Sequence, residues 1–193
     1  MQLFYSATSP YARKVRVLAI ELGVDKTLEL IEASPLSNPP ALLAANPLGK
    51  IPALVRDDGS VLFDSPVICE YLAAGNEAIL PSAGEARWQV LRLQALADGL
   101  MDAAFSRTME LRRPEAERSP SWIARWSEGM VRIVATAQPG EGFGLGEIAL
   151  TVALGYLDFR CGDLNWRDHA PALADWYAAQ EKRPSVATTA PPV

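Results

Sequence analysis

The residues Ser9-Pro10-Tyr11-Ala12 stand where a short apolar segment, residues 2–5, gives way to a helical pattern. Proline is favoured at the first position of a helix, so Pro10 makes Ser9 the expected N-cap. A hydroxyl and several backbone N–H groups would then converge at the positive end of the helix dipole, which favours an anion. Neither Ser9 nor Ala12 can form the disulfide of a redox motif. The site therefore suits a thiol brought by a ligand, and the alternative is a Ser-Pro pair that only caps a helix.

A second segment, Asn46-Pro47-Leu48-Gly49-Lys50-Ile51-Pro52-Ala53-Leu54, leads into an expected strand. Pro52 at the strand start has no N–H to donate, and the Ile51–Pro52 bond is a candidate for the cis isomer. A cis bond would turn the backbone N–H and C=O of Ile51 outward, where a short extended peptide can pair with them. An ordinary turn before an edge strand is the alternative.

The third segment, Phe63-Asp64-Ser65-Pro66-Val67-Ile68-Cys69-Glu70-Tyr71-Leu72, repeats the Ser-Pro signal. With Pro66 at the first helical position, Ser65 is the expected N-cap, and this second helix start suits a carboxylate. Asp64 beside it can accept a hydrogen bond from an ammonium group. The pair predicts a receptor for the zwitterionic end of an amino acid, against the alternative of a capped structural helix.

Two kinds of element must position these segments. Strand signals and helical patterns alternate over roughly the first 75 residues, with strands at 2–5, 27–31, 53–57 and 61–64 and helices at 10–22, 41–45 and 66–74. Asp58-Gly59 is a hairpin signal between the last two strands. The order predicts a thioredoxin-like mixed sheet with a parallel first pair, a hairpin, and helices on both faces. The three segments would then meet at one end of the sheet.

The rest of the chain is mainly helical after a linker at residues 75–84. Apolar periodicity predicts helices at 85–111, 121–137, 145–159 and 171–182. We expect two domains, residues 1–75 and an all-helical domain at residues 84–193, with an irregular tail at 188–193 packed loosely on the surface. The helix at 145 starts with Gly144 where a hydroxyl cap would be usual, and Glu147 completes the pattern.

Composition narrows the classes of function. The formal net charge of −5 argues against nucleic acid as a partner. No apolar run is long enough to span a membrane, and no signal peptide is evident. Two widely spaced cysteines, Cys69 and Cys161, predict a reducing, cytoplasmic setting rather than a disulfide framework. With His169 as the single histidine and no clustered cysteines, no metal site is expected.

Taken together, the three segments imply a small peptide ligand with a central thiol and a free amino-acid end, which glutathione fits. Over nearly its whole length the chain resembles a soluble glutathione transferase of a serine-type bacterial branch, through the three segments above and Ala153-Leu-Gly-Tyr-Leu-Asp-Phe-Arg160. The resemblance implies that Ser9 is the thiol-activating hydroxyl and that the chain is a homodimer. It implies that Lys50 contacts the glycyl end, Ile51 the cysteinyl backbone, and Asp64 and Ser65 the γ-glutamyl end.

The reaction expected from this resemblance is attack of the glutathione thiolate on a small apolar electrophile, with no metal required. Tyr11, Met101, Phe105 and Met109 are the candidates for the electrophile pocket, although methionines and aromatics at helical spacing are often core residues. Two alternatives stay open. One is a glutathione-binding sensor or partner protein without catalysis, and the other is a thiol-disulfide reductase, which would need a cysteine at position 9.

Overall fold

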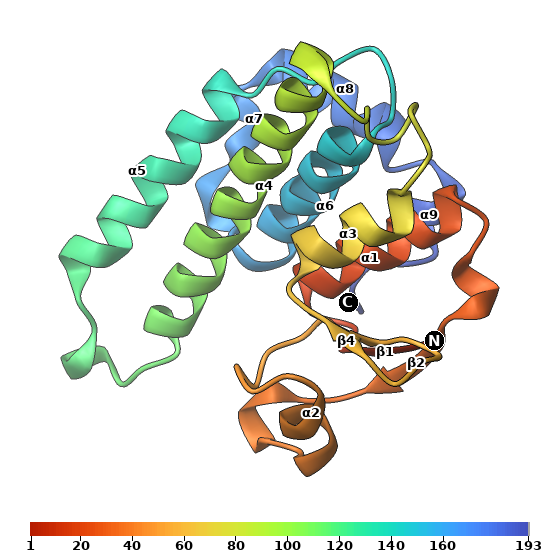
Figure 1. Ribbon diagram of the computed structural model, residues 1–193. Helices are drawn as coiled ribbons and strands as arrows, with labels where there is room; N and C mark the ends of the chain where they lie inside the picture. The colour runs from red at the N-terminus through yellow and green to blue at the C-terminus, as the bar shows by residue number, and fades with distance from the viewer. Residues whose placement is uncertain (193) are drawn as a thin grey trace. The chain divides into compact units, whose positions relative to one another are not determined.

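The computed structural model describes residues 1–192 and divides into two units (Figure 1). The first unit comprises Met1–Ser82 together with Pro184–Pro192, and the second comprises Ala83–Arg183. The sequence had placed residues 184–192 in the helical domain, whereas their contacts group them with the first unit.

The first unit is built on a four-stranded mixed sheet in the order β2-β1-β3-β4. Its elements are β1 (Gln2–Tyr5), α1 (Pro10–Glu21), the 3-10 turn η1 (Asp25–Thr27), β2 (Glu29–Glu32), η2 (Pro35–Ser37), α2 (Pro40–Ala45), β3 (Ala53–Val55), β4 (Val61–Leu62), α3 (Ser65–Ala73) and α9 (Pro184–Ala187). β1 pairs with β2 in parallel and with β3 antiparallel, and β3 pairs antiparallel with β4. The predicted fold of this half is confirmed.

Apolar side chains hold the helices against the two faces of this sheet. α1 and α3 pack against each other on one side, and α2 lies on the other (Figure 1). Leu3 of β1, Val15 and Leu18 of α1, and Ile68 of α3 are all fully buried between these elements. Beneath α2, a cluster of Phe4, Ala33, Leu42, Ile51 and Ala53 forms a second small core. The segment that carries Ile51 is therefore anchored by the side chain of Ile51 itself.

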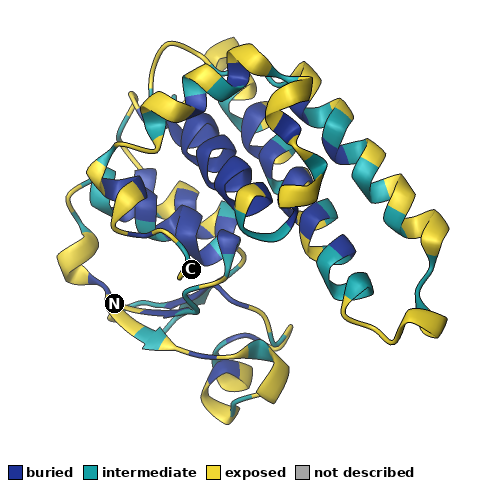
Figure 2. Ribbon diagram, turned by 180° about the vertical axis from the view of Figure 1, so that it is seen from behind, coloured by how far each residue is buried: buried dark blue, intermediate teal, exposed yellow. Residues whose placement is uncertain are grey.

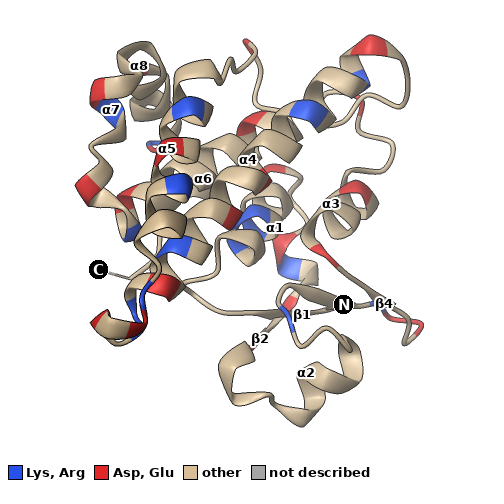
Figure 3. Cartoon of the chain, turned by 90° about the vertical axis from the view of Figure 1, so that its left-hand side faces the viewer, with Lys and Arg blue, Asp and Glu red and all other residues tan. Residues whose placement is uncertain are grey.

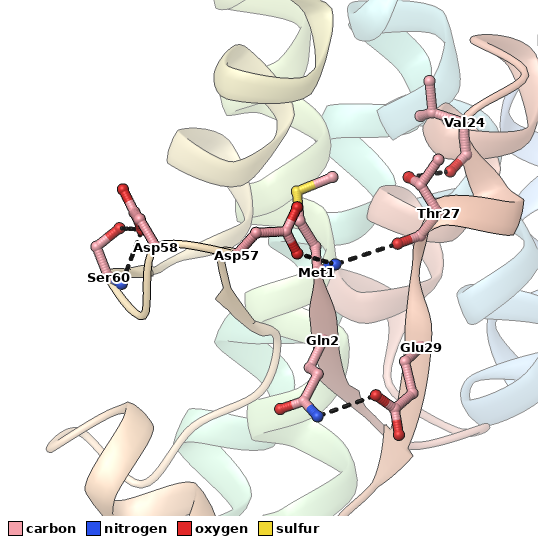
Figure 4. Close-up of polar contacts among 8 residues, drawn as sticks. All are labelled: Met1, Gln2, Val24, Thr27, Glu29, Asp57, Asp58 and Ser60. Carbon is pink, nitrogen blue, oxygen red and sulfur yellow. Dashed lines mark hydrogen bonds and ion pairs between the residues drawn. The ribbon is translucent and has the colours of Figure 1, made fainter.

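Polar contacts tie the start of β1 to both neighbouring segments (Figure 4). The backbone nitrogen of Met1 lies 2.8 Å from Oδ1 of Asp57 and 3.3 Å from the carbonyl oxygen of Thr27. Gln2 donates from Nε2 to Glu29 at 2.9 Å. These contacts link β1 to β2 and to the β3–β4 turn at the sheet end opposite the three candidate segments.

The β3–β4 hairpin forms as predicted, but its turn is longer than the expected two residues. The N–H of Arg56 donates to the carbonyl of Ser60 at 2.8 Å, which leaves residues 57–59 as a three-residue loop. Gly59 adopts a φ of 81°, and a left-handed residue at the end of such a loop is typical of three-residue hairpins.

The second unit consists of helices α4 (Gly84–Leu111), α5 (Pro120–Thr136), α6 (Leu145–Arg160), α7 (Trp166–His169) and α8 (Pro171–Gln180), with 3-10 turns η3 (Glu115–Glu117) and η4 (Gly162–Leu164). α7 and the 3-10 turns were not predicted. Every residue of α6 from Leu145 to Leu157 is buried, and the dark blue helix in Figure 2 shows this core. No helix in residues 1–192 is long and apolar enough to cross a membrane.

The buried start of α6 solves its capping problem through Glu147. This buried side chain accepts a hydrogen bond from the N–H of Gly144 at 3.1 Å and another from the N–H of Gly140 at 2.8 Å. Only this half of a capping box can exist, because Gly144 has no side chain to complete the other half. The carboxylate thus fixes both the helix start and the loop before it.

The tail is irregular over residues 188–192, as predicted, but it is not packed loosely throughout, because Thr189 is buried. Thr189 is only 2% exposed, and its hydroxyl donates to the carbonyl of Ser185 at 2.7 Å. The residues before it form α9, which lies against α1. Val193 lies outside the described residues.

Helix α6 approaches α4 so closely that we expect Gly146→Ala to destabilise the protein. A Cβ at position 146 would lie 3.0 Å from both the Cβ of Leu93 and the carbonyl oxygen of Val90, so the two helices would have to separate. Overpacking of this kind costs about 1–3 kcal/mol in the free energy of unfolding. Chemical denaturation measures it.

The matched control for this prediction is Gly99→Ala in α4. Gly99 is exposed, and a Cβ there would meet nothing within 4 Å. Replacing an exposed helical glycine by alanine should stabilise the protein by about 0.5–1 kcal/mol. Equal effects of the two substitutions would contradict the close-packing interpretation.

Candidate functional site

The sheet register brings the three candidate segments to one end of the first unit. β1 runs toward Ser9, and Phe4 near its end pairs with Ala53 at the start of β3. β4 runs antiparallel to β3, so the chain leaves β4 toward Asp64 at the same end of the sheet. One end of the sheet therefore carries all three segments, as the sequence predicts: the start of α1, the turn before β3 and the start of α3.

Ser9 is the N-cap of α1, as predicted, with Pro10 at the first helical position. Its Oγ accepts a hydrogen bond from the N–H of Ala12 at 3.2 Å, and its carbonyl accepts from the N–H of Arg13 at 3.0 Å. A hydroxyl has one proton to donate besides its lone pairs, and within residues 1–192 the Ser9 hydroxyl has no acceptor. Capping therefore leaves the O–H donor available to an anion.

The turn before β3 is organised by Asn46, a fully buried residue that the sequence argument did not single out. Its amide Nδ2 donates to the carbonyl of Lys50 at 2.8 Å, and its Oδ1 accepts from the N–H of Leu48 at 3.0 Å. The backbone carbonyl of Asn46 accepts from Gly49, whose φ is 63°. The Asn-Pro start of the turn was the available signal, because Asn side chains often close such turns.

The turn ends at Ile51, whose peptide bond to Pro52 has the predicted isomer. The Ile51–Pro52 bond is cis, which confirms that prediction. The side chain of Ile51 is buried in the small core, while neither its N–H nor its C=O has a hydrogen-bond partner within residues 1–192. Most backbone groups of a folded chain are paired, so this unpaired donor and acceptor match what an added peptide would need. Lys50 beside it is exposed and has no ion-pair partner in the same described part.

At the start of α3 the cap differs from the prediction by one residue. Asp64 occupies the N-cap position, although its side chain does not cap the helix, and Ser65 is the first helical residue. Asp64 is exposed, whereas Ser65 is only 2% exposed. Neither side chain forms a hydrogen bond or an ion pair within the described chain. The Ser65 hydroxyl thus has no partner within the described chain, and it lies at a helix N-terminus, where an anion is favoured.

The residues predicted to line an electrophile pocket belong to different units. Tyr11 lies in α1 of the first unit, while Met101, Phe105 and Met109 lie in α4 of the second. Met101 is fully buried, which supports a packing role rather than contact with a ligand. Phe105 is 44% exposed and Met109 is half-buried. Tyr11, Phe105 and Met109 stay predictions.

The two cysteines do not contribute a reactive thiol to this site. Burial raises the pKa of the Cys161 thiol, against the lowering effect of Arg107, so this cysteine stays protonated at neutral pH. Cys69 is also fully buried. No group of three or more metal-ligating side chains comes together among residues 1–192. Basic and acidic positions are interspersed along the chain in both units (Figure 3).

The first unit is thioredoxin-like, with two helix N-termini and a cis-proline turn at one end of its sheet. An all-helical unit follows it, so the chain has the two-domain glutathione transferase fold that the sequence predicts. Comparison with known proteins makes the assignment specific. Residues 8–74 match the glutathione S-transferase N-terminal domain, and residues 120–179 match the C-terminal domain. The chain belongs to the glutathione S-transferase family.

Relatives match the chain along its full length. The GST-like protein YibF of Escherichia coli K12 is 35% identical, covering 100% of this chain and 99% of its own. A glutathione transferase family member from Pseudomonas fluorescens Pf-5, solved with bound glutathione, is 42% identical with a TM-score of 0.94, covering 100% of this chain and 99% of that one. A further structure from Pseudomonas fluorescens Pf-5 holds S-(propanoic acid)-glutathione; it is 40% identical with a TM-score of 0.90, and both chains are fully covered.

We expect Asn46→Ala to lower the free energy of unfolding by about 1–3 kcal/mol, because it removes two partly buried hydrogen bonds that close the turn. Its amide holds two backbone groups of the turn, those of Lys50 and Leu48. Chemical denaturation measures the loss. As a control, Asn76→Ala removes one turn hydrogen bond, to the N–H of Ile79, from a half-buried side chain and should cost less. Equal losses would contradict a special role for Asn46.

Proposed function

We propose that this protein is a glutathione transferase of the serine type, in which the Ser9 hydroxyl holds the glutathione thiol as a thiolate for attack on a small electrophile. The observation that carries the proposal is the set of unpaired polar groups at one sheet edge: the O–H of Ser9, the backbone of Ile51 and the hydroxyl of Ser65. Relatives solved with glutathione bound support the same ligand for this chain.

Each of these groups matches one part of the peptide. The outward N–H and C=O of Ile51 pair with the cysteinyl backbone, as in strand addition. The α3 start and Ser65 receive the γ-glutamyl carboxylate, and Asp64 accepts from the γ-glutamyl ammonium. Lys50 meets the carboxylate of the glycyl end. These contacts hold the ligand at its two ends and leave its thiol at the start of α1.

The start of α1 and Ser9 can supply the free energy needed to lower the pKa of the bound thiol. A free thiol has a pKa of about 8.5, and lowering it by ~2 units takes ~2.7 kcal/mol. A hydrogen bond to a charged acceptor contributes about 1.5–3 kcal/mol, and a helix terminus about 0.3–1 kcal/mol more. Ser9 and the start of α1 together are sufficient without a metal. An electron pair of the thiolate sulfur forms the new bond to the electrophile. If the electrophile carries a leaving group, that group departs with the electron pair of the bond that breaks.

The proposal also includes the electrophilic substrate and the oligomeric state of the protein. The bound S-(propanoic acid)-glutathione of a relative supports a site that tolerates a substituent on the sulfur. Tyr11 is the proposed contact of a small apolar electrophile in the first unit, and Phe105 and Met109 of the second unit stay sequence-based predictions. We propose a homodimer from the family resemblance and the long helix after the linker, and a cytoplasmic setting from the two widely spaced cysteines.

A non-catalytic glutathione-binding protein is the second candidate, because binding and catalysis would use the same residues. Measured turnover of a generic aryl halide, set beside glutathione affinity, separates the two functions. The reductase alternative has less support, since position 9 holds a serine and both cysteines of the chain are buried.

Ser9→Ala should raise the pKa of the bound glutathione thiol by ~1–2 units and slow conjugation near neutral pH about 10–100-fold. Glutathione affinity should change little, because the contacts of the peptide's ends remain. Thiolate absorbance against pH and conjugation rates measure the two effects.

Ser119→Ala is a matched control, because Ser119-Pro120 caps α5 as Ser9-Pro10 caps α1. It should lower stability as any lost cap does, with the thiol pKa unchanged. An unchanged thiol titration and rate in Ser9→Ala would show that Ser9 is only a cap, and Ser6 or Tyr5 would become the donor to test.

Ser65→Ala should weaken glutathione binding by about 1–3 kcal/mol through loss of a hydrogen bond to a carboxylate. Ser65 makes no hydrogen bond within the described chain, so removing its hydroxyl should leave the free energy of unfolding nearly unchanged. Calorimetry measures the affinity and denaturation the stability. Unaltered affinity would rule out this placement of the γ-glutamyl end.

A further inference from the structure

The segment Pro184–Pro192, here called the returning segment, packs on α1, the helix whose first turn carries Ser9. In Figure 1 the blue end of the chain, with α9, lies beside the red α1. Both elements belong to the first unit, although about 170 residues separate Arg13 from Val186 and Thr189 in the chain. Ser185, Val186 and Thr189 are each no more than 2% exposed, so the contact is a packed one.

Arg13 makes the polar link between the two. Its side chain is only 6% exposed, and its Nη2 donates to the carbonyl of Val186 at 3.0 Å. Its Nε lies 3.4 Å from Oγ1 of Thr189, which itself donates to the carbonyl of Ser185 at 2.7 Å. A buried guanidinium must be hydrogen-bonded, so the returning segment is part of what allows Arg13 to be buried.

Arg13 is also joined directly to Ser9. Its backbone N–H donates to the Ser9 carbonyl at 3.0 Å, the first backbone hydrogen bond of α1. The direction of the Ser9 hydroxyl depends on where this first turn sits. A side chain that pins the turn therefore bears on the position of the donors that an anion meets at the helix start.

The other end of α1 has its own contact with the returning segment. The hydroxyl of Ser185 donates to a carboxylate oxygen of Glu21, the last residue of the helix. The segment thus touches α1 at both ends, and only the Arg13 contact adjoins the turn of Ser9. The contact at Glu21 can therefore serve as a control for the contact at Arg13.

We propose that Arg13 is a positioning residue for the thiol site, and that the returning segment, through Val186 and Thr189, fixes the first turn of α1 so that Ser9 faces the thiol. The inference rests on the proposed thiol-activating role of Ser9, and it extends the site to a part of the chain that no candidate segment includes.

The test uses the full-length Ser9→Cys protein, in which the introduced thiol reports on the start of α1 without any glutathione. A thiol at a helix N-terminus has a lowered pKa, measured here by the pH dependence of its alkylation with iodoacetamide. Cys69 and Cys161 are fully buried, so the reaction reports on position 9. Arg13→Lys and Thr189→Val both keep the charge near the site and disturb only its hydrogen bonds.

In the Ser9→Cys background, Arg13→Lys and Thr189→Val should each raise the pKa of the introduced thiol by about 0.3–0.7 unit, the range expected for a weakened helix-terminus interaction. Ser185→Ala, at the far end of α1, and Thr188→Val, at an exposed neighbour, should leave the pKa unchanged. Circular dichroism identifies the folded variants, and the nearly isosteric Thr189→Val keeps the test open if Arg13→Lys does not fold.

Two results would overturn the proposal: an unchanged thiol pKa in folded Thr189→Val, or an equal shift in Ser185→Ala. Because the readout needs no glutathione, it is independent of whether the proposed function holds. In the protein with Ser9 intact, Thr189→Val should lower the kcat of conjugation and leave the KM for glutathione nearly unchanged. Absence of glutathione binding in the unmutated protein would instead count against the proposed function.

Discussion

The organisation of the site depends on how the hydroxyl of Ser9 divides its hydrogen bonds. An exposed helix start needs acceptors for its N–H groups, and the Ser9 oxygen supplies one to Ala12 at 3.2 Å. The same oxygen carries one proton, which capping does not use. Structural capping and thiol activation are therefore compatible roles of one side chain. Glycine at this position would remove the hydroxyl, and cysteine would replace it with a reactive thiol, whereas serine allows both roles.

The rest of the first unit holds this helix start near the turn that precedes β3. The parallel β1–β2 pair and the antiparallel β3 bring the end of β1 and the start of β3 together, with Phe4 opposite Ala53. Asn46 shapes the turn that follows α2, and the side chain of Ile51 anchors that turn from below. The turn thus holds Ile51 by its side chain, while its backbone N–H and C=O stay unpaired within the described chain.

Local signals made the sheet, the three segments and the cis Ile51–Pro52 bond predictable, because caps, turns and strand periods act over a few residues. The exact cap of α3 was missed by one residue, since Asp64 and Ser65 are both good capping types. Contacts between distant parts of the chain leave no local signal. The burial of Thr189 against Arg13 and the core position of Met101 depend on such packing, and sequence periodicity alone could not separate them from surface or pocket roles.

The starts of α6 and α3 both lack a hydroxyl cap, but only the start of α6 is capped by another side chain. At the buried start of α6, Glu147 reaches back to the N–H groups of Gly144 and Gly140, so two of the donors near that helix start are paired internally. At the start of α3, Asp64 and Ser65 offer two side chains suited to the same task, and neither is used. The unpaired Ser65 hydroxyl and the unpaired backbone groups of Ile51 lie at the same end of the sheet. Helix N-termini favour anions, so these groups are the part of the structure on which the proposed peptide site depends.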